Sequence, residues 1–403
     1  MPRASAFGVY VHFPYCLSKC PYCDFASVVA EAIPHRAYAA AIAGELARRA
    51  GEHGRPASGV ESIYFGGGTP SLWDVACVGE TIEAIDRLFG IASDGEITLE
   101  ANPGASDAAR FAALRAAGVN RLSIGVQSFH AEALAGLGRR HTPCEAVAAL
   151  ERAQDAGFPR VSIDLIFGAP GQTPETAEAD ARRAVELGTD HLSFYGLTLE
   201  GLAEDVRLAK EVRRGRVQVP DDGAQARMGA IVREVLEGAG FARYEISNFA
   251  RPGAECRHNL LYWRGGEYAA AGCGAWGFRR TASGGFRYGN PRKPEAYLAA
   301  VEAGADPAAE FDEIDAAGLF EERMFLGLRL VDGLDLDEAV RDTVGTLPAS
   351  TARAIDRLVA EGLLIREGSR LRCTERGLEF HTDVAVRLLP DETPAKTALP
   401  VLG

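Results

Sequence analysis

The fold is decided at residues 10–25, which read YVHFPYCLSKCPYCDF and place three thiols in a Cys-x3-Cys-x2-Cys spacing just after an apolar run. The three thiols belong to Cys16, Cys20 and Cys23. A loop with this spacing can wrap three thiolates around one cluster of four irons, which leaves one iron open to a further ligand. The alternative is a zinc ion, but structural zinc sites use four protein ligands, and only His12 and Asp24 are local candidates for the fourth. The spacing therefore favours an iron–sulfur cluster over zinc.

Six short apolar, β-branched runs follow one another through the first half of the chain and predict β-strands. They lie at residues 8–13, 62–66, 97–101, 121–126, 160–167 and 191–197. Ala-rich stretches between them, such as 35–50 and 143–156, carry apolar residues at helical spacing, as the crossover helices of a parallel sheet do. We therefore predict an α/β fold, a partial (β/α)6 barrel of the TIM type, with its site at the carboxyl ends of the strands.

The pattern changes after this barrel, and four segments are predicted. They are a barrel core at 1–210, an appendage that completes the barrel at 211–310, a C-terminal domain at 311–390 and a mobile tail at 391–403. The C-terminal domain carries three helical patterns at 316–330, 336–344 and 350–361, followed by a hairpin pattern at 363–374. This order is typical of a winged-helix-like domain. The absence of a basic stripe favours a packing or protein-contact role for it over DNA binding.

Composition and charge narrow the classes of partner. The chain has 403 residues, of which 47% are hydrophobic and 25% charged, as in globular proteins. Its 43 Lys and Arg stand against 56 Asp and Glu, and the net charge of -13 argues against nucleic acid and for a small molecule or a protein. The eight cysteines are too sparse for a disulfide framework. No apolar leader and no run of roughly 18 apolar residues is present, so we expect a cytoplasmic protein without a transmembrane segment.

The cysteine loop, with the pair Asp24-Phe25 after it, resembles the radical S-adenosylmethionine (SAM) superfamily. This resemblance implies a [4Fe-4S] cluster and SAM, whose methionine part would bind the open iron. A glycine-rich turn is then expected after the second strand, and residues 64–71 read YFGGGTPS. Positions without side chains allow the backbone to approach the amino group of the cofactor closely.

Further positions match the HemN-like branch of that superfamily, in which the corresponding residues contact the cofactor. Glu100 and Gln127 end the third and fourth predicted strands, Asp164 lies within the fifth, and Arg139 is expected in the helix after the fourth. The carboxylates would bind the ribose hydroxyls and the arginine the cofactor carboxylate. The full set of cofactor contacts implied by the resemblance is Tyr10, Gly67, Gly68, Thr69, Glu100, Gln127, Arg139 and Asp164.

Two features distinguish members of the branch. Oxygen-independent coproporphyrinogen III oxidases carry a fourth cysteine where this chain has Phe25, and an extension before the cluster. The stretch 258–263, HNLLYW, matches the His-Asn-x-x-Tyr-Trp signature of the HemW-type haem chaperones. In a helix His258 and Tyr262 would share one face. An imidazole can bind haem iron and aromatic rings offer it flat apolar surface, so His258, Tyr262 and Trp263 are the candidate haem residues.

The resemblance, which runs from Val9 to about Gly377, therefore implies a haem chaperone that binds haem and passes it to acceptor haemoproteins, membrane-bound ones among them. We assign no catalytic residue. The alternatives are radical oxidative decarboxylation of coproporphyrinogen III, and radical SAM chemistry on an unrelated substrate. The sequence does not decide between a monomer and a homodimer.

Overall fold

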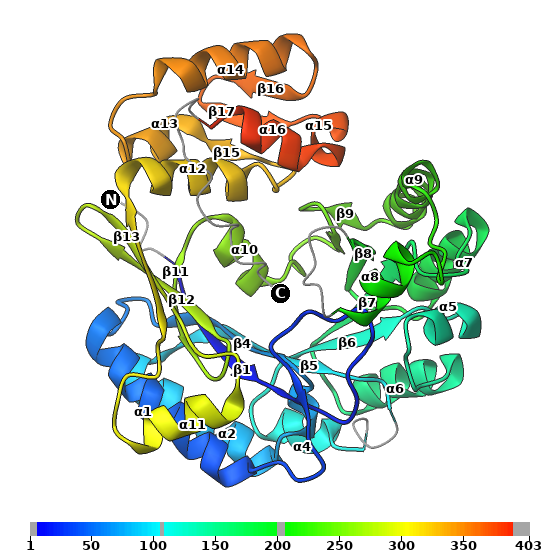
Figure 1. The fold of residues 1–403 in the computed structure, drawn as a ribbon, viewed down its shortest axis with the longest axis vertical. Helices are drawn as coiled ribbons and strands as arrows, with labels where there is room; N and C mark the ends of the chain where they lie inside the picture. The colour runs from blue at the N-terminus through cyan, green and yellow to red at the C-terminus, as the bar shows by residue number, and fades with distance from the viewer. Residues whose placement is uncertain (1–5, 105–108, 200–205, 390–403) are drawn as a thin grey trace.

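The computed structural model describes residues 6–104, 109–199 and 206–389. Within them a 12-stranded sheet forms the body of the molecule, and a smaller domain closes over its concave side (Figure 1). Six parallel strands pair in chain order at the centre of the sheet. They are β1 (Phe7–Phe13), β4 (Val60–Gly67), β5 (Ile91–Ala101), β6 (Arg121–Gln127), β7 (Arg160–Phe167) and β8 (His191–Gly196). The predicted α/β fold with a central parallel sheet is confirmed.

The alternation of side chains along each strand separates the core from the site. In β7 the buried residues Val161, Ile163 and Leu165 belong to the hydrophobic core between the sheet and the outer helices, whereas Asp164 and Ile166 line a cavity on the other face. The same division holds in the neighbouring strands. The side chains on the outer face of the sheet form the hydrophobic core, and those on the concave face line the cavity.

The outer face of the sheet is covered by helices that the crossover pattern predicted (Figure 1). They are α1 (His35–His53), α2 (Val75–Phe89), α4 (Phe111–Ala116), α6 (Pro143–Asp155) and α7 (Pro174–Glu186). Helix α9 (Asp222–Gly238), from the predicted appendage, packs beside α7. Helices α6 and α7 begin with the same local signal. Thr142 and Thr173 each cap the helix with a side-chain hydrogen bond, and a proline stands in the first turn, where its missing N–H costs nothing.

Strands from the region after β8 extend the sheet at both edges. At one edge β10 (Asn248–Ala250) and β9 (Ala242–Arg243) pair antiparallel beside β8. At the other edge β11 (Glu267–Ala271) pairs parallel with β1, which makes a seventh parallel strand that the sequence did not predict. Its sequence, EYAAA, carries no β-branched residue. Antiparallel strands β12 (Trp276–Thr281), β13 (Gly284–Gly289) and β14 (Glu310–Asp315) follow it.

Helix α10 (Arg257–Trp263) lies on the concave face, against β1 and β4 (Figure 1). The remaining elements around the barrel are short or peripheral. They are β2 (Tyr15–Cys16), β3 (Val28–Val29), the 3-10 turn at Pro70–Leu72, α5 (Ala131–Gly136), α8 (Arg207–Arg213) and α11 (Pro294–Glu302). No helix among the described residues is long and apolar enough to cross a membrane.

The C-terminal domain has the predicted order of helices and hairpin, with its own apolar core around Ile355, Leu358 and Leu371. Its elements are α12 (Ala316–Gly327), β15 (Leu334–Asp335), α13 (Leu336–Arg341), α14 (Ala349–Ala360), β16 (Leu364–Glu367), β17 (Arg370–Cys373), α15 (Glu375–Glu379) and α16 (His381–Arg387). A salt bridge of 3.0 Å between Arg329 and the fully buried Glu245 fixes the domain to the barrel. The predicted tail at 391–403 lies outside the described residues.

Candidate functional site

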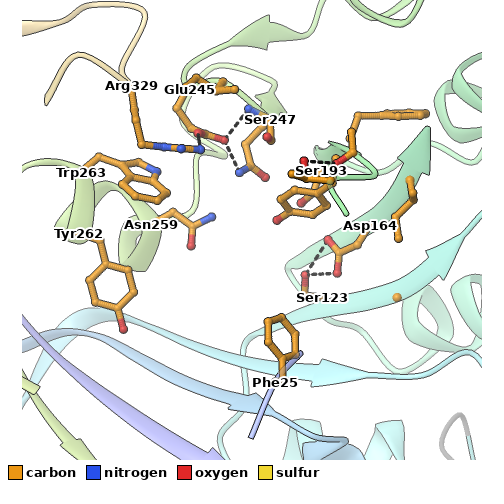
Figure 2. A pocket seen from close by; sticks show the side chains of 18 of the residues that line it. Phe25, Ser123, Asp164, Ser193, Glu245, Ser247, Asn259, Tyr262, Trp263 and Arg329 are labelled. Atoms are coloured by element: carbon orange, nitrogen blue, oxygen red, sulfur yellow. Dashed lines mark hydrogen bonds and ion pairs between the residues drawn. The ribbon is translucent and has the colours of Figure 1, made fainter. Parts of the chain in front are cut away.

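A cavity of about 1550 Å³ lies between the concave face of the sheet, α10 and the C-terminal domain. One end, here called the cluster end, is lined by Cys16, Cys20 and Cys23. The other, here called the domain end, is lined by α12 and the end of α10. Phe25 and Asp164 point into the space from one side, and Tyr262, Trp263 and Arg329 border it on the other (Figure 2).

The three predicted cysteines all carry free, partly exposed thiols in this cavity. The Thr69 hydroxyl donates to the sulfur of Cys16 at 3.4 Å, and the Arg139 guanidinium donates to the sulfur of Cys20 at 3.5 Å. Burial raises the pKa of the Cys16 and Cys23 thiols. Among the described residues no three His, Cys, Asp or Glu side chains gather around a position for a single metal ion.

The glycine-rich turn is built against the chain segment that leads to Cys16. The backbone N–H of Gly68 donates to the carbonyl of Phe13 at 2.7 Å, and that of Thr69 to the carbonyl of Tyr15 at 3.0 Å. Gly67 has a φ of 108°, which residues with side chains rarely adopt, and a Cβ there would overlap the ring of His12. A Cβ on Gly68 would lie 2.8 Å from backbone atoms. Both glycines are required by the packing, and together they form a cradle without side chains.

Glu100 on β5 and Asp164 on β7 face the cavity, with β6 between them in the sheet. Glu100 accepts hydrogen bonds from the Tyr64 hydroxyl at 2.8 Å and from the Gly67 backbone at 3.1 Å. Burial raises the pKa of Glu100 to about 7, against the effect of the Tyr64 hydrogen bond. Asp164 accepts from the Ser123 hydroxyl at 2.9 and 3.0 Å (Figure 2), and burial raises its pKa as well. Each carboxylate is held in place while oxygen lone pairs remain for a ligand.

Gln127 and Arg139 lie beside this pair in the cavity lining. Gln127 has a φ of 69° at an irregularity between β6 and β7, and it is the one non-glycine residue with positive φ in the described part of the chain. Strain of this kind gathers at functional sites. Arg139 donates to the carbonyl of Gly125 at 2.7 Å, and its buried Nε has no partner. The expectation that Arg139 lies within a helix is wrong, because α5 ends at Gly136.

Asn102 is a site residue that we did not predict. Its side chain accepts a hydrogen bond from Arg139 and donates one of 3.0 Å to the Thr69 hydroxyl, which in turn reaches Cys16. Asn102 therefore links the arginine, the glycine-rich turn and the cysteine loop. The signal for it was available. It follows Glu100 by two positions, and a strand places residues two apart on the same face.

Tyr10 projects from β1 toward the concave face but does not line the cavity. Its hydroxyl pairs with Nδ1 of His12 at 3.0 Å, and Nε2 of His12 donates to the carbonyl of Ala26 at 2.9 Å. Burial lowers the pKa of His12 to about 4, which keeps the ring neutral at physiological pH. Tyr10 and His12 thus hold the cysteine loop against β1 through the carbonyl of Ala26.

The predicted haem residues on α10 divide into two groups. Tyr262 and Trp263 line the cavity, and Asn259 points into it beside them (Figure 2). His258 is 1% exposed and does not line it. Its Nδ1 pairs with the Ser62 hydroxyl at 2.9 Å and its Nε2 with the Tyr262 hydroxyl at 2.8 Å. Burial lowers the pKa of His258 to about 3. Both ring nitrogens are occupied, so this histidine holds Tyr262 rather than facing the cavity.

The partial parallel barrel, its cysteine loop and its glycine-rich turn define a protein of the radical SAM superfamily, and the superfamily profile matches residues 10–184. The HemN C-terminal domain matches residues 314–380. The protein called heme chaperone HemW in Mycobacterium tuberculosis (strain ATCC 25618 / H37Rv) is 38% identical over 387 residues, which cover 95% of this chain and 94% of that one. The chain belongs to the HemW family.

A second relative and one solved structure are also similar to this chain. The heme chaperone HemW of Escherichia coli (strain K12) is 41% identical over 280 residues, which cover 69% of this chain and 71% of that protein. The solved structure of coproporphyrinogen III oxidase, HemN, from Escherichia coli superposes with a TM-score of 0.79 at 22% identity, over 96% of this chain and 90% of that one. The second likeness shows a common fold.

Proposed function

We propose that this protein is a haem chaperone that binds haem in the cavity and transfers it to acceptor haemoproteins, membrane-bound ones among them, while carrying a [4Fe-4S] cluster and SAM. The observation that carries the proposal is the 38% identity, over 95% of this chain, to a protein named heme chaperone HemW. The cavity supports it, because about 1550 Å³ exceeds the roughly 300–1,000 Å³ of an ordinary small-molecule site and leaves room for a second ligand beside SAM.

The residues at the cluster end fit the implied cluster. Three thiols share one wall of the cavity, and donors from Thr69 and Arg139 already contact two of the sulfurs. Cys16, Cys20 and Cys23 would hold the cluster, and the hydrogen bonds to the sulfurs would tune it. When bound, the cluster would supply an open iron position and reducing electrons.

The fit for SAM rests on the backbone cradle and on an unpartnered donor. The cradle at Gly67 and Gly68 would receive the amino acid part of the cofactor, and the buried Nε of Arg139 would donate to its carboxylate. Glu100 and Asp164 offer acceptors to ribose hydroxyls, with Gln127 between them on the lining. These residues would bind and orient the cofactor.

For haem, the aromatic side of the cavity is the natural surface. Tyr262 and Trp263 would contact the flat apolar ring of the haem. His258, which does not line the cavity, would hold Tyr262 in position through the hydrogen bond to its hydroxyl. Phe25 stands 43% exposed beside the cluster loop and adds apolar surface where the resemblance places a fourth cysteine in the oxidases. This substitution favours binding over decarboxylation.

The deciding experiment is anaerobic reconstitution with iron and sulfide, then titration with haem followed by absorbance, with coproporphyrinogen turnover assayed in the same sample. Saturable haem binding without turnover, and release of that haem to an apo-haemoprotein, would support the chaperone. Turnover without haem binding would replace it with the oxidase.

A further inference from the structure

The domain end of the cavity contains more hydrogen-bond donors than acceptors to satisfy them. Here the end of α10 meets α12, and Arg329 lies over the indole of Trp263, 4.3 Å from the ring centroid. Arg329 gives one nitrogen to Glu245 at 3.0 Å, but its buried Nε has no partner. The buried Nε1 of Trp263 also has none. Neither an indole N–H nor a guanidinium N–H can accept a hydrogen bond, so Nε of Arg329 and Nε1 of Trp263 are two buried donors without an acceptor.

Arg323 adds a cation at the same place. It projects from α12 into the cavity lining, and its stem lies close to Gly265, where a Cβ would be 2.8 Å from its Cδ. No hydrogen-bond acceptor or ion-pair partner contacts its guanidinium within the described part of the chain. The adjacent Glu322 does not pair with Arg323, since it binds Arg287 in a bidentate pair at 2.8 and 3.0 Å.

The positive charge of Arg323 is only partly compensated by its surroundings. Arg280, whose guanidinium donates to the Gly265 carbonyl at 3.0 Å, lies near enough to repel it. Partial burial and this neighbour lower the pKa of Arg323, while Glu338 and Asp342 act weakly against them from the C-terminal domain. A half-buried cation without a counter-ion, beside two unpartnered donors, is a site prepared for an anion.

The geometry points to a carboxylate subsite formed by Arg323, Arg329 and Trp263, which binds the propionate side chains of a tetrapyrrole at the domain end of the cavity. This inference rests on the proposed function and deepens it by giving the ligand an orientation. The carboxylates of the ligand would lie between α10 and α12, and its ring would extend toward the cluster end past Tyr262, which borders the cavity beside Trp263 (Figure 2). Because Arg323 and Arg329 come from the C-terminal domain and Trp263 from the barrel, the ligand joins the two parts of the molecule.

The test compares three probes on the full chain. They are haem, haem dimethyl ester, in which both carboxylates are blocked, and metal-free coproporphyrin III. In Arg323→Gln we expect haem affinity to fall about tenfold or more, while affinity for the ester stays as in the wild type. Arg323→Lys should retain most of the haem affinity. Arg353→Gln, an exposed arginine on α14, is the matched control and should change nothing.

A second variant guards against loss of folding. Trp263→Phe keeps the ring and removes the N–H, so it should weaken haem binding severalfold and leave ester binding unchanged. If Arg323→Gln and Trp263→Phe bind haem and the ester in the wild-type ratio, the subsite is wrong and the haem chaperone stands. If the wild type binds no haem, the chaperone is wrong. In that case the coproporphyrin III measurement alone tests the subsite. If the wild type binds coproporphyrin III and Arg323→Gln binds it more weakly, the subsite is supported. If the wild type does not bind it, the subsite is wrong.

Discussion

The backbone N–H of Gly67 donates a hydrogen bond of 3.1 Å to the carboxylate of Glu100, which joins the turn after β4 to the end of β5. The hydroxyl of Tyr64 reaches the other oxygen of the same carboxylate at 2.8 Å. The glycine cradle and the carboxylate are therefore one unit. A substitution at Gly67 should therefore alter the position of the Glu100 carboxylate, and a substitution at Glu100 should alter the turn. The two residues can be tested separately.

Stability should depend on pH through Glu100. Its ordinary pKa of 4.5 is raised to about 7 by burial, so the folded state keeps the proton over a range in which the unfolded state has lost it. The resulting stability is complete below pH 4.5 and is lost as the pH rises to 7, by at most about 3 kcal/mol. Glu100→Gln should remove this loss, because the amide does not titrate.

Urea unfolding of the wild type and Glu100→Gln at pH 5 and pH 8 measures the difference. The stability of the wild type relative to the variant should fall between the two pH values. Glu310→Gln, at an exposed position in β14, provides the control. Parallel pH dependence of the wild type and Glu100→Gln would show that Glu100 does not carry the effect.

Gly67→Ala should destabilise the protein more than an ordinary glycine substitution. Gly67 and Gly171 both have positive φ, at 108° and 80°, so alanine is strained at either position. A Cβ at Gly171 meets no atom within 4 Å, whereas at Gly67 it overlaps the ring of His12, which two hydrogen bonds hold in place. We expect a loss of about 1 kcal/mol for Gly171→Ala and about 2–4 kcal/mol for Gly67→Ala.

Chemical denaturation gives both values, and SAM binding measured by calorimetry on the reconstituted protein gives the second readout. Only Gly67→Ala should lower SAM affinity. Equal losses of stability for the two variants would mean that the turn can move away from His12, and the cradle would then be less rigid than its hydrogen bonds indicate.

The cluster assignment predicts a large spectroscopic effect from a small change. Cys16→Ser removes one of three thiolates, and the reconstituted protein should lose its brown absorbance together with its bound iron and sulfide. Cys144→Ser changes an exposed cysteine in α6, outside the cavity, and should leave the spectrum intact. Full iron and sulfide content in Cys16→Ser would contradict a cluster on these cysteines.

Most of the barrel could be predicted because its strands carry local signals. The run Arg160–Phe167 alternates Val161, Ile163 and Leu165 with polar positions, and this pattern specifies both a strand and its buried face. Strand β11 lacked such a signal because alanines fit a helix as well as a strand. Its place beside β1 is decided by pairing between residues about 260 positions apart, which no local pattern encodes.

The site likewise contains residues that the sequence could predict and residues whose role it could not. Cys16 and Gly67 are visible through spacing and composition, because three thiols in one loop and three consecutive glycines are uncommon. The role of His258 was hidden, because helical spacing predicts its pairing with Tyr262 but not the face that it buries. That face is fixed by Ser62 on β4, 196 positions earlier in the chain.

The position of His258 makes a final prediction about haem ligation. In His258→Ala the Ser62 and Tyr262 hydroxyls lose their partner inside the protein, so the free energy of unfolding should fall by about 2–4 kcal/mol. Because the imidazole does not line the cavity, the Soret band of the haem complex should keep its wild-type position. His130→Ala, at a histidine whose side chain is 38% exposed, is the control for both measurements. A Soret shift confined to His258→Ala would show instead that the ring leaves its buried partners and binds the iron.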